Sequence, residues 1–217
     1  MNKVLFVMVM LTLAGCATTE QVDLAEGRKQ FAARQIGKEP GRTPASPPSG
    51  ISAAETQTLT AQATQGNAEA QVRLGWMYAF GEGVPQDYPT ARKWWEKAAT
   101  QGDVVAQDSL GELYADGRGG AQDYSKARTW WEKSAAQGNA VSQIRLGALY
   151  EMGYGVPQDF VRAHMWYNVA GTALSGDLGK TAMKNRDSIA SRMTVAQIEK
   201  AQERARRCQE TKFKECD

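Results

Sequence analysis

Histidine is almost missing from this chain, which limits the chemistry it can perform. The 217 residues include one histidine, His164, and three cysteines. Many hydrolases and zinc enzymes place a histidine beside a nucleophile, an acid or further metal ligands. Neither the single histidine nor the cysteines have such neighbours in sequence. We therefore predict no metal site and no cofactor.

Motifs of covalent catalysis are missing as well. The chain has no Gly-x-Ser-x-Gly elbow, and no serine is followed three residues later by lysine. Gly179, Lys180 and Thr181 match the end of a phosphate-binding loop, but Leu174 stands where its first glycine belongs. We predict that the protein is not an enzyme. A cell-wall or β-lactam-acting hydrolase is the least favoured alternative, and a turnover assay would reveal it.

Excess charge is also absent. The net charge is +2, too small for a protein that binds a polyanion, so nucleic acid is not an expected partner. The apolar run from Val4 to Ala14 is too short to span a bilayer and indicates a signal peptide.

Leu13, Ala14, Gly15 and Cys16 resemble a lipobox, the site at which signal peptidase II cuts before a diacylated cysteine. The resemblance implies a signal peptide over residues 1–15, a lipid on Cys16 and membrane contact through that lipid only. Ala17 is not the aspartate associated with inner-membrane retention, which favours the periplasmic face of the outer membrane. The alternative is an ordinary secretory signal. Residues 16–50 carry four prolines and little apolar periodicity, so we expect a flexible tether.

Cys208 and Cys216 then remain as a pair in an oxidising compartment. A disulfide needs Cα atoms within about 7 Å, whereas eight residues of helix rise about 12 Å. A disulfide therefore requires the helix to end before Cys216. The alternative is two free thiols in a frayed tail.

One stretch occurs three times. It starts at Ala63 and begins again 36 residues later at Ala99 and at Ala135. Each unit holds two helical patterns, which predicts an all-α solenoid of stacked antiparallel helix pairs. Asparagine or aspartate is expected to cap both helices of each pair, and a glycine to end the first helix of the pair.

We expect three repeats over residues 67–170, preceded by an N-terminal capping helix over 51–66. Residues 171–217 should form C-terminal capping helices and a tail. Ser52 with Glu55, and Thr194 with Gln197, form capping-box patterns that mark the first and last helices. Tryptophans of the second helices are expected in the core: Trp94, Trp95, Trp130, Trp131 and Trp166. His164 shares the register of Arg92 and Arg128, so we expect it on a solvent-facing side.

The repeated Ala-Gln, Leu-Gly, Tyr, Gly-x-Gly, Gln-Asp and Trp positions resemble the Sel1-like repeat, a relative of the tetratricopeptide repeat. Departures from the pattern are few: Gly120 and Ala121 replace Val-Pro, Ser142 replaces alanine, and Phe160 replaces tyrosine. The resemblance implies a right-handed superhelical solenoid whose first helices line a concave groove. It also implies a monomeric scaffold or adaptor for protein partners. An immunity-type lipoprotein that neutralises a secreted effector is the alternative.

One column of residues on the first helices is the candidate partner-binding groove. Its members recur at spacing four: Val72, Trp76 and Phe80; Asp108, Glu112 and Asp116; Ile144, Ala148 and Met152. An acidic stripe between two apolar ones predicts a partner segment with a basic centre, anchored by the aromatic residues. In the alternative interpretation the apolar residues pack beneath the capping helices and the acids are solvated.

Overall fold

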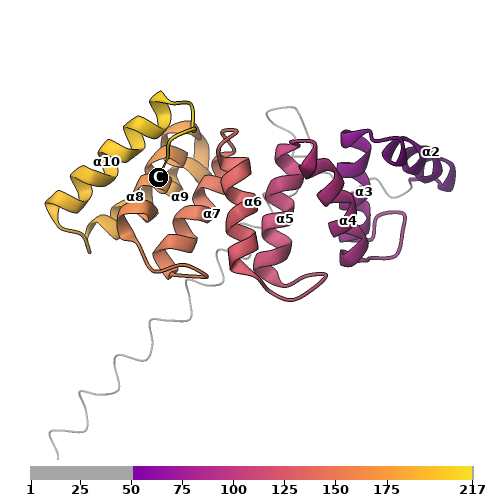
Figure 1. The fold of residues 1–217 in the computed structure, drawn as a ribbon, viewed down its shortest axis with the longest axis horizontal. Coiled ribbons are helices and arrows are strands. Elements are labelled where there is room, and N and C mark those ends of the chain that lie inside the picture. The colour runs from indigo at the N-terminus through magenta and orange to yellow at the C-terminus, as the bar shows by residue number, and fades with distance from the viewer. Residues whose placement is uncertain (1–50, 217) are drawn as a thin grey trace, which may run out of the picture. The chain divides into compact units, whose positions relative to one another are not determined.

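A computed structural model describes residues 51–216, and every regular element in that range is an α-helix (Figure 1). The helix bounds are α2 Ala53–Thr64, α3 Ala68–Phe80, α4 Tyr88–Thr100, α5 Val104–Asp116, α6 Tyr124–Ala135, α7 Ala140–Met152, α8 Phe160–Ala173, α9 Gly176–Ala190 and α10 Val195–Glu210. None of these helices is long and apolar enough to cross a membrane. The predicted signal peptide, lipidated Cys16 and tether lie outside the described residues.

The helix ends follow the predicted capping pattern. Asn67, Asp103 and Asn139 accept hydrogen bonds from first-turn amides of α3, α5 and α7. The second helices α4, α6 and α8 are capped in the same way by Asp87, Asp123 and Asp159. Both capping boxes are present, at α2 and at α10. Local sequence thus determines where these helices begin.

Each first helix ends at a glycine with positive φ, a conformation that residues with a Cβ rarely adopt. The three glycines are Gly81, Gly117 and Gly153, with φ of +74°, +68° and +70°. The following loop then turns the chain back into the second helix.

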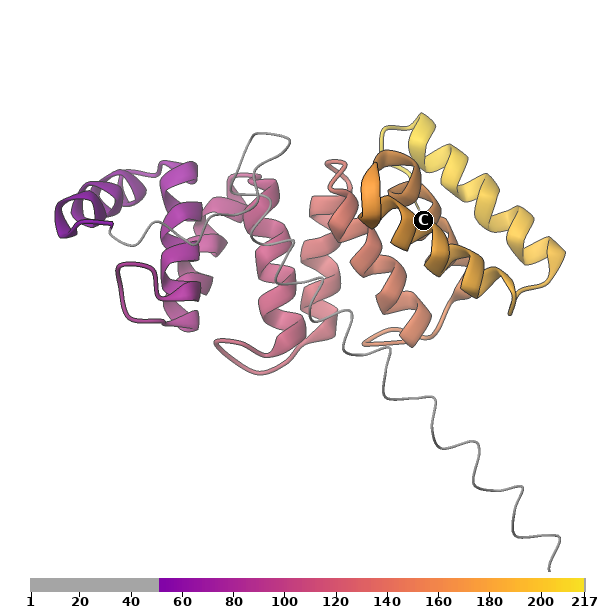
Figure 2. The ribbon, with the colours of Figure 1, turned by 180° about the vertical axis from the view of Figure 1, so that it is seen from behind.

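Helices α2 to α9 stack in chain order (Figures 1 and 2). Within a repeat, α3 packs on α4, α5 on α6 and α7 on α8, and each second helix also packs on the first helix of the next repeat. This nearest-neighbour packing gives the helical-repeat solenoid expected from the 36-residue period.

A tryptophan ring under a glycine fixes the spacing inside the first two repeats. A Cβ on Gly75 would lie 2.1 Å from Trp95 Nε1, so only glycine fits there. The same indole donates a hydrogen bond to the Val72 carbonyl over 3.2 Å. Trp131 repeats the arrangement beneath Gly111. Close helix approach therefore depends on this glycine and tryptophan pair.

In the third repeat a tyrosine ring takes the place of the tryptophan ring beneath the glycine. Tyr167 takes the register of Trp131 and lies beneath Gly147, where a Cβ would approach its ring to 2.8 Å. Its hydroxyl donates to Glu151 Oε2 over 2.9 Å. Burial, together with the Glu151 carboxylate, raises the pKa of Tyr167 far above its usual value, so the hydroxyl keeps its proton.

The expectation that all five repeat tryptophans are core residues is partly wrong. Trp95, Trp131 and Trp166 are buried, but Trp94 and Trp130 are only half-buried. The ammonium groups of Lys97 and Lys133 lie over these two rings, at 4.2 Å and 4.3 Å from the centroids. Each ring thus covers the core with one face while the other meets a lysine, a common use of an amphipathic side chain.

The ends of the stack are built differently. At the N-terminal end, Leu59 and Ala63 of α2 pack against Leu74 and Met77 of α3. At the C-terminal end, α9 and α10 both pack against α8. The fourth pair is therefore not a further repeat, because α10 does not cover α9 as α4, α6 and α8 cover their partners.

A disulfide joins Cys208 to Cys216. Helix α10 ends at Glu210, and the chain folds back through Lys212 and Phe213, which both have positive φ. The Phe213 ring lies against Gly138, where a Cβ would be 3.1 Å from it. The tail is thereby held on the loop that opens the third repeat.

Within each of the first two repeats, a buried glutamine of the first helix pairs with an exposed glutamine at the end of the second helix. Gln101 Nε2 donates to Gln71 Oε1 over 2.8 Å, and Gln137 Nε2 donates to Gln107 Oε1 over 2.9 Å. Both pairs are 30 residues apart, and the third would join Gln143 to position 173, which is an alanine. Gln143 Oε1 is buried and has no hydrogen-bond partner. The series of glutamine pairs therefore stops at the last repeat.

Candidate partner-binding surface

The candidate residues occupy three consecutive first helices, and together they are called the helix-A surface here. They are Val72, Trp76 and Phe80 on α3, Asp108, Glu112 and Asp116 on α5, and Ile144, Ala148 and Met152 on α7. Phe80 and Met152 are exposed, with 48% and 53% of their areas accessible, and the other seven are half-buried. Seven partly covered side chains form the body of this surface, and two exposed apolar side chains stand at the helix ends.

The aromatic part is a rigid stack. The rings of Trp76 and Phe80 are parallel, with centroids 5.2 Å apart and planes 8° apart. The Trp76 ring also meets the buried Trp95 edge-on, with centroids 5.3 Å apart. Trp76 packs on the α4–α5 core, whereas the contacts of α2 go to Leu74 and Met77. One packed ring thus supports one exposed ring, which suits an anchor for an apolar side chain.

The acidic residues of the surface are paired with a cation of the protein itself. Arg145 of α7 reaches back to α5 and pairs with both Asp108 and Glu112. Ser142 Oγ also donates to Asp108 Oδ1 over 2.6 Å. Two of the three carboxylates therefore share one cation from the next repeat. Asp116 is 3.3 Å from Arg118 Nη2, in the loop that follows α5.

The charge of Arg145 is secured by its surroundings. Burial opposes a charge on the guanidinium, but the carboxylates of Asp108 and Glu112 outweigh it and raise the pKa of Arg145. The guanidinium carbon also lies 5.7 Å from the centroid of the Trp131 ring. Arg145 is thus a fixed cation that ties the second repeat to the third.

Sequence reasoning missed Arg145 as part of this surface, although a signal was available. The register of Arg145 holds Ser109 on α5 and Arg73 on α3. Only the second repeat carries acids in the column of the helix-A surface, and Arg145 on the following repeat reaches two of them. Ser142, noted as a departure from the repeat pattern, marks the same contact.

The expectation of a solvent-facing His164 is wrong. Its exposed fraction is 3%, and its Nδ1 has no hydrogen-bond partner. Burial and the positive charge of Arg186 lower the pKa of His164, whereas Asp187 raises it by less. The packing of α9 on α8 causes the difference, because Arg92 and Arg128 at the same register lie only half-buried.

The structure gathers no metal-binding cluster within residues 51–216, where no three His, Cys, Asp or Glu residues could share an ion. Cys208 and Cys216 are joined to each other and so are not free ligands. The described surface offers contact area, aromatic anchors and fixed charges.

These features define a helical-repeat protein with a continuous side-chain surface on its first helices. Comparison with known families identifies the repeat. The Sel1 repeat model matches residues 68–103, 104–139 and 140–173. The chain belongs to the Sel1 repeat family, and proteins built from this repeat are generally non-catalytic protein-interaction scaffolds.

Two solved structures are similar to it. A Sel1 repeat protein from Oxalobacter formigenes is 35% identical with a TM-score of 0.52, and the match covers 59% of this chain and 96% of that one. A protective antigen present in uropathogenic Escherichia coli strains, displaying an SLR fold, is 24% identical with a TM-score of 0.55. That match covers 89% of this chain and 46% of the antigen, so the chain spans about half of its length. No curated protein matches the chain.

Proposed function

We propose that this protein is a lipid-anchored scaffold or adaptor that binds a segment of a protein partner on the helix-A surface. The family supports protein binding as the general activity. The resemblance to the tetratricopeptide repeat supports the first helices as the lining of the binding groove. The partner lies against side chains from three repeats, which gives contact area without a single deep pocket.

The observation that carries the proposal is the stacked pair of Trp76 and Phe80. Phe80 is a large aromatic side chain left 48% exposed on a well-packed helix. Aromatic residues on rigid elements dominate the energetics of protein interfaces because they bury much area at low entropic cost. The acidic part contributes less, since Asp108 and Glu112 are already paired with Arg145. Met152 on α7 offers a second exposed apolar contact.

The proposed location follows from the N-terminal sequence. Cys16 carries the lipid, and the solenoid faces the periplasm at the outer membrane. Residues 16–50 then connect the anchor to the binding domain. An immunity-type role, in which the partner is a secreted effector, would use the same helix-A surface and is the second candidate.

The proposal is tested by placing a photoreactive amino acid at position 80 of the full chain and cross-linking in cells. The covalent partner is identified, and its capture is then compared between the unmodified protein, Phe80→Ala and Trp76→Ala. Loss of one central aromatic contact should weaken capture by about tenfold or more, because such residues contribute roughly 2 kcal/mol.

Tyr154→Ala is the matched control. Tyr154 is 41% exposed and stacks on Tyr124, but it lies outside the helix-A surface. Undiminished capture by both Phe80→Ala and Trp76→Ala, or equal loss in Tyr154→Ala, would refute the aromatic anchor.

A further inference from the structure

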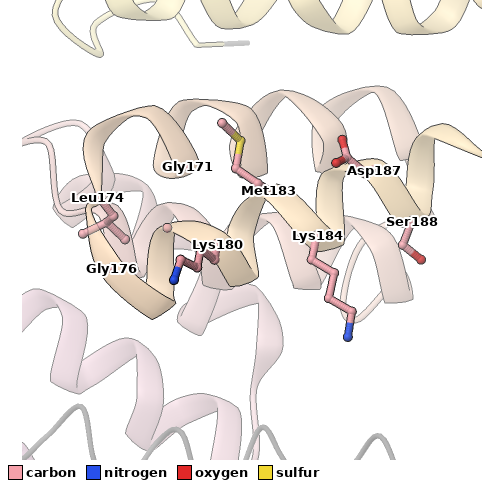
Figure 3. Close-up of a pocket in the computed structure, with 9 residues that line it drawn as sticks. Gly171, Leu174, Gly176, Lys180, Met183, Lys184, Asp187 and Ser188 are labelled. Atoms are coloured by element: carbon pink, nitrogen blue, oxygen red, sulfur yellow. The ribbon is translucent and has the colours of Figure 1, made fainter.

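The 36-residue register of the helix-A surface continues onto α9. Adding one period to Ile144, Ala148 and Met152 gives Lys180, Lys184 and Ser188, although the repeat pattern itself ends at residue 173. In Figure 3 these three side chains project from one edge of α9, whereas Met183 and Asp187 project from the opposite edge. The surface therefore has a fourth column, and it is basic.

A hollow of about 730 Å³ lies along this helix. Its apolar lining comes from Gly171 of α8, from Leu174 just after that helix, and from Gly176, Gly179 and Met183 of α9. Lys180 and Lys184 stand at its rim (Figure 3). Helix α10 packs on α8 and leaves this face of α9 uncovered. The hollow is thus an unpartnered helix face next to the proposed binding surface.

Two glycines of the lining allow close packing between the end of α8 and α9. Gly179 takes the register of Gln143, whose side chain fills the space between helices in the last repeat. A Cβ on Gly179 would lie 2.3 Å from the Leu174 carbonyl oxygen, and one on Gly171 would lie 2.8 Å from Met183 Sδ. No larger side chain fits at Gly179 because the Leu174 backbone is too close, whereas a Cβ on Gly171 would require the Met183 side chain to move.

The rim charge is positive. Asp187 is held by its neighbour Arg186, whose Nε and Nη2 donate to Asp187 Oδ1 over 2.8 Å and 2.6 Å. Lys180 is 82% exposed and lies 3.7 Å from Asp177, which is 92% exposed, so this ion pair has little energetic value. The two lysines therefore give the rim of the apolar hollow a positive electrostatic potential.

From this combination we infer that the α9 hollow receives the acidic end of the partner, a peptide segment with one large apolar side chain flanked by carboxylates. The inference rests on the proposed function and specifies how the partner segment is oriented on the surface. Its apolar end lies on Trp76 and Phe80, and its acidic end lies on Lys180 and Lys184. The apolar side chain enters the hollow and the carboxylates pair with the lysines, which provides complementary charge at the rim.

The test uses the full chain with ¹³C-labelled methionine methyl groups. Met183 lines the hollow, while the buried Met77 and Met165 serve as internal references. The probes are a short synthetic peptide with one leucine flanked by glutamates and a counterpart with lysines in place of the glutamates. The acidic peptide should shift the Met183 resonance to saturation, and the basic peptide should not.

Lys180→Glu combined with Lys184→Glu should lower the affinity for the acidic peptide by about tenfold, because both rim charges are reversed. Lys93→Glu combined with Lys200→Glu changes the net charge equally at exposed sites outside the hollow and should have no effect. The inference would be overturned if the Met183 resonance did not shift, or if both peptides shifted it equally. An equal loss of affinity for the acidic peptide in the control variant would also overturn it.

Two further results separate this inference from its alternatives. Phe80→Ala should leave the Met183 response intact, so a silent Met183 with loss of partner capture in Phe80→Ala refutes the hollow alone. Phosphatidylglycerol vesicles provide the membrane control. Vesicle binding that requires Lys180 and Lys184, without a response to the acidic peptide, would assign the lysines to a lipid surface and overturn the inference.

Discussion

Arg145 lies between two carboxylates of the preceding repeat, with 17% of its side chain exposed. Arg145 stabilises the folded protein by compensating the charges of Asp108 and Glu112. Its removal leaves these two carboxylates as uncompensated, partly buried charges. The stability of the junction between the second and third repeats therefore depends on a pairing that spans them.

Arg145→Met should lower the free energy of unfolding by about 2 kcal/mol, less than the loss of a fully buried pair because the site is partly exposed. Adding Asp108→Asn and Glu112→Gln should recover much of the loss, since the uncompensated charges disappear. Urea denaturation measures both changes. Arg73→Met is the control, because Arg73 has the same register on α3 and is exposed. Equal destabilisation by Arg73→Met would contradict this account.

His164 predicts a pH dependence. Its pKa in the folded protein is lowered from the usual 6.5, mainly by burial and also by Arg186. Below about pH 6.5 the unfolded chain takes up a proton that the folded chain resists, so stability falls as the pH falls. The loss approaches about 1.4 kcal/mol for each pH unit until the folded pKa is reached.

The measurement is the urea midpoint between pH 7.5 and 5.5, where His164 is the only histidine that titrates. The free energy of unfolding should decrease across this range in the unmodified protein and stay nearly level in His164→Gln. The lowered pKa values of Glu55 and Asp123 act in a separate, more acidic range. Parallel pH profiles for the two proteins would contradict the role of His164.

Among the structural elements, α8 is where the repeat pattern stops. Its last residue, Ala173, stands where earlier repeats place the glutamine that donates to the buried glutamine of the first helix. The consequence is a buried acceptor, Gln143 Oε1, without a donor. An unsatisfied buried acceptor carries a desolvation penalty.

Ala173→Gln should restore the missing donor and stabilise the protein by about 1 kcal/mol, the net value of a typical hydrogen bond. Thermal unfolding followed by circular dichroism would detect the rise in Tm. Ala173→Glu has nearly the same shape but offers no donor, and it should give no gain. A similar Tm for both variants would show that the effect is not a hydrogen bond.

The C-terminal elements depart furthest from the repeat. The spacing of Cys208 and Cys216 left a disulfide or two free thiols open, and the early end of α10 at Glu210 permits the bond. Phe213 then packs on Gly138, far away in sequence. Contacts of this kind depend on the path of a short tail and have no periodic signal in the sequence.

For the whole molecule, the stacking of neighbouring repeats makes function a property of surfaces that cross several units. The helix-A surface draws on α3, α5 and α7, and the proposed extension adds α9. The aromatic end lies in the first repeat and the basic end lies on α9, beyond the last repeat, so the two ends together would not be recognised from one repeat alone. A partner that contacts both ends must extend from α3 to α9.

The 36-residue period, the capping residues and the Leu-Gly and tryptophan positions were enough to determine the helices and their pairwise order. Their physical basis is local: caps satisfy first-turn amides, glycines end helices, and a glycine opposite an indole sets the helix spacing. Tertiary structure alone decided the partners of the acids, the burial of His164 and the half-exposure of Trp94 and Trp130. Those outcomes depend on which side chain of the next helix fills or leaves a given space, and the sequence period does not contain that information.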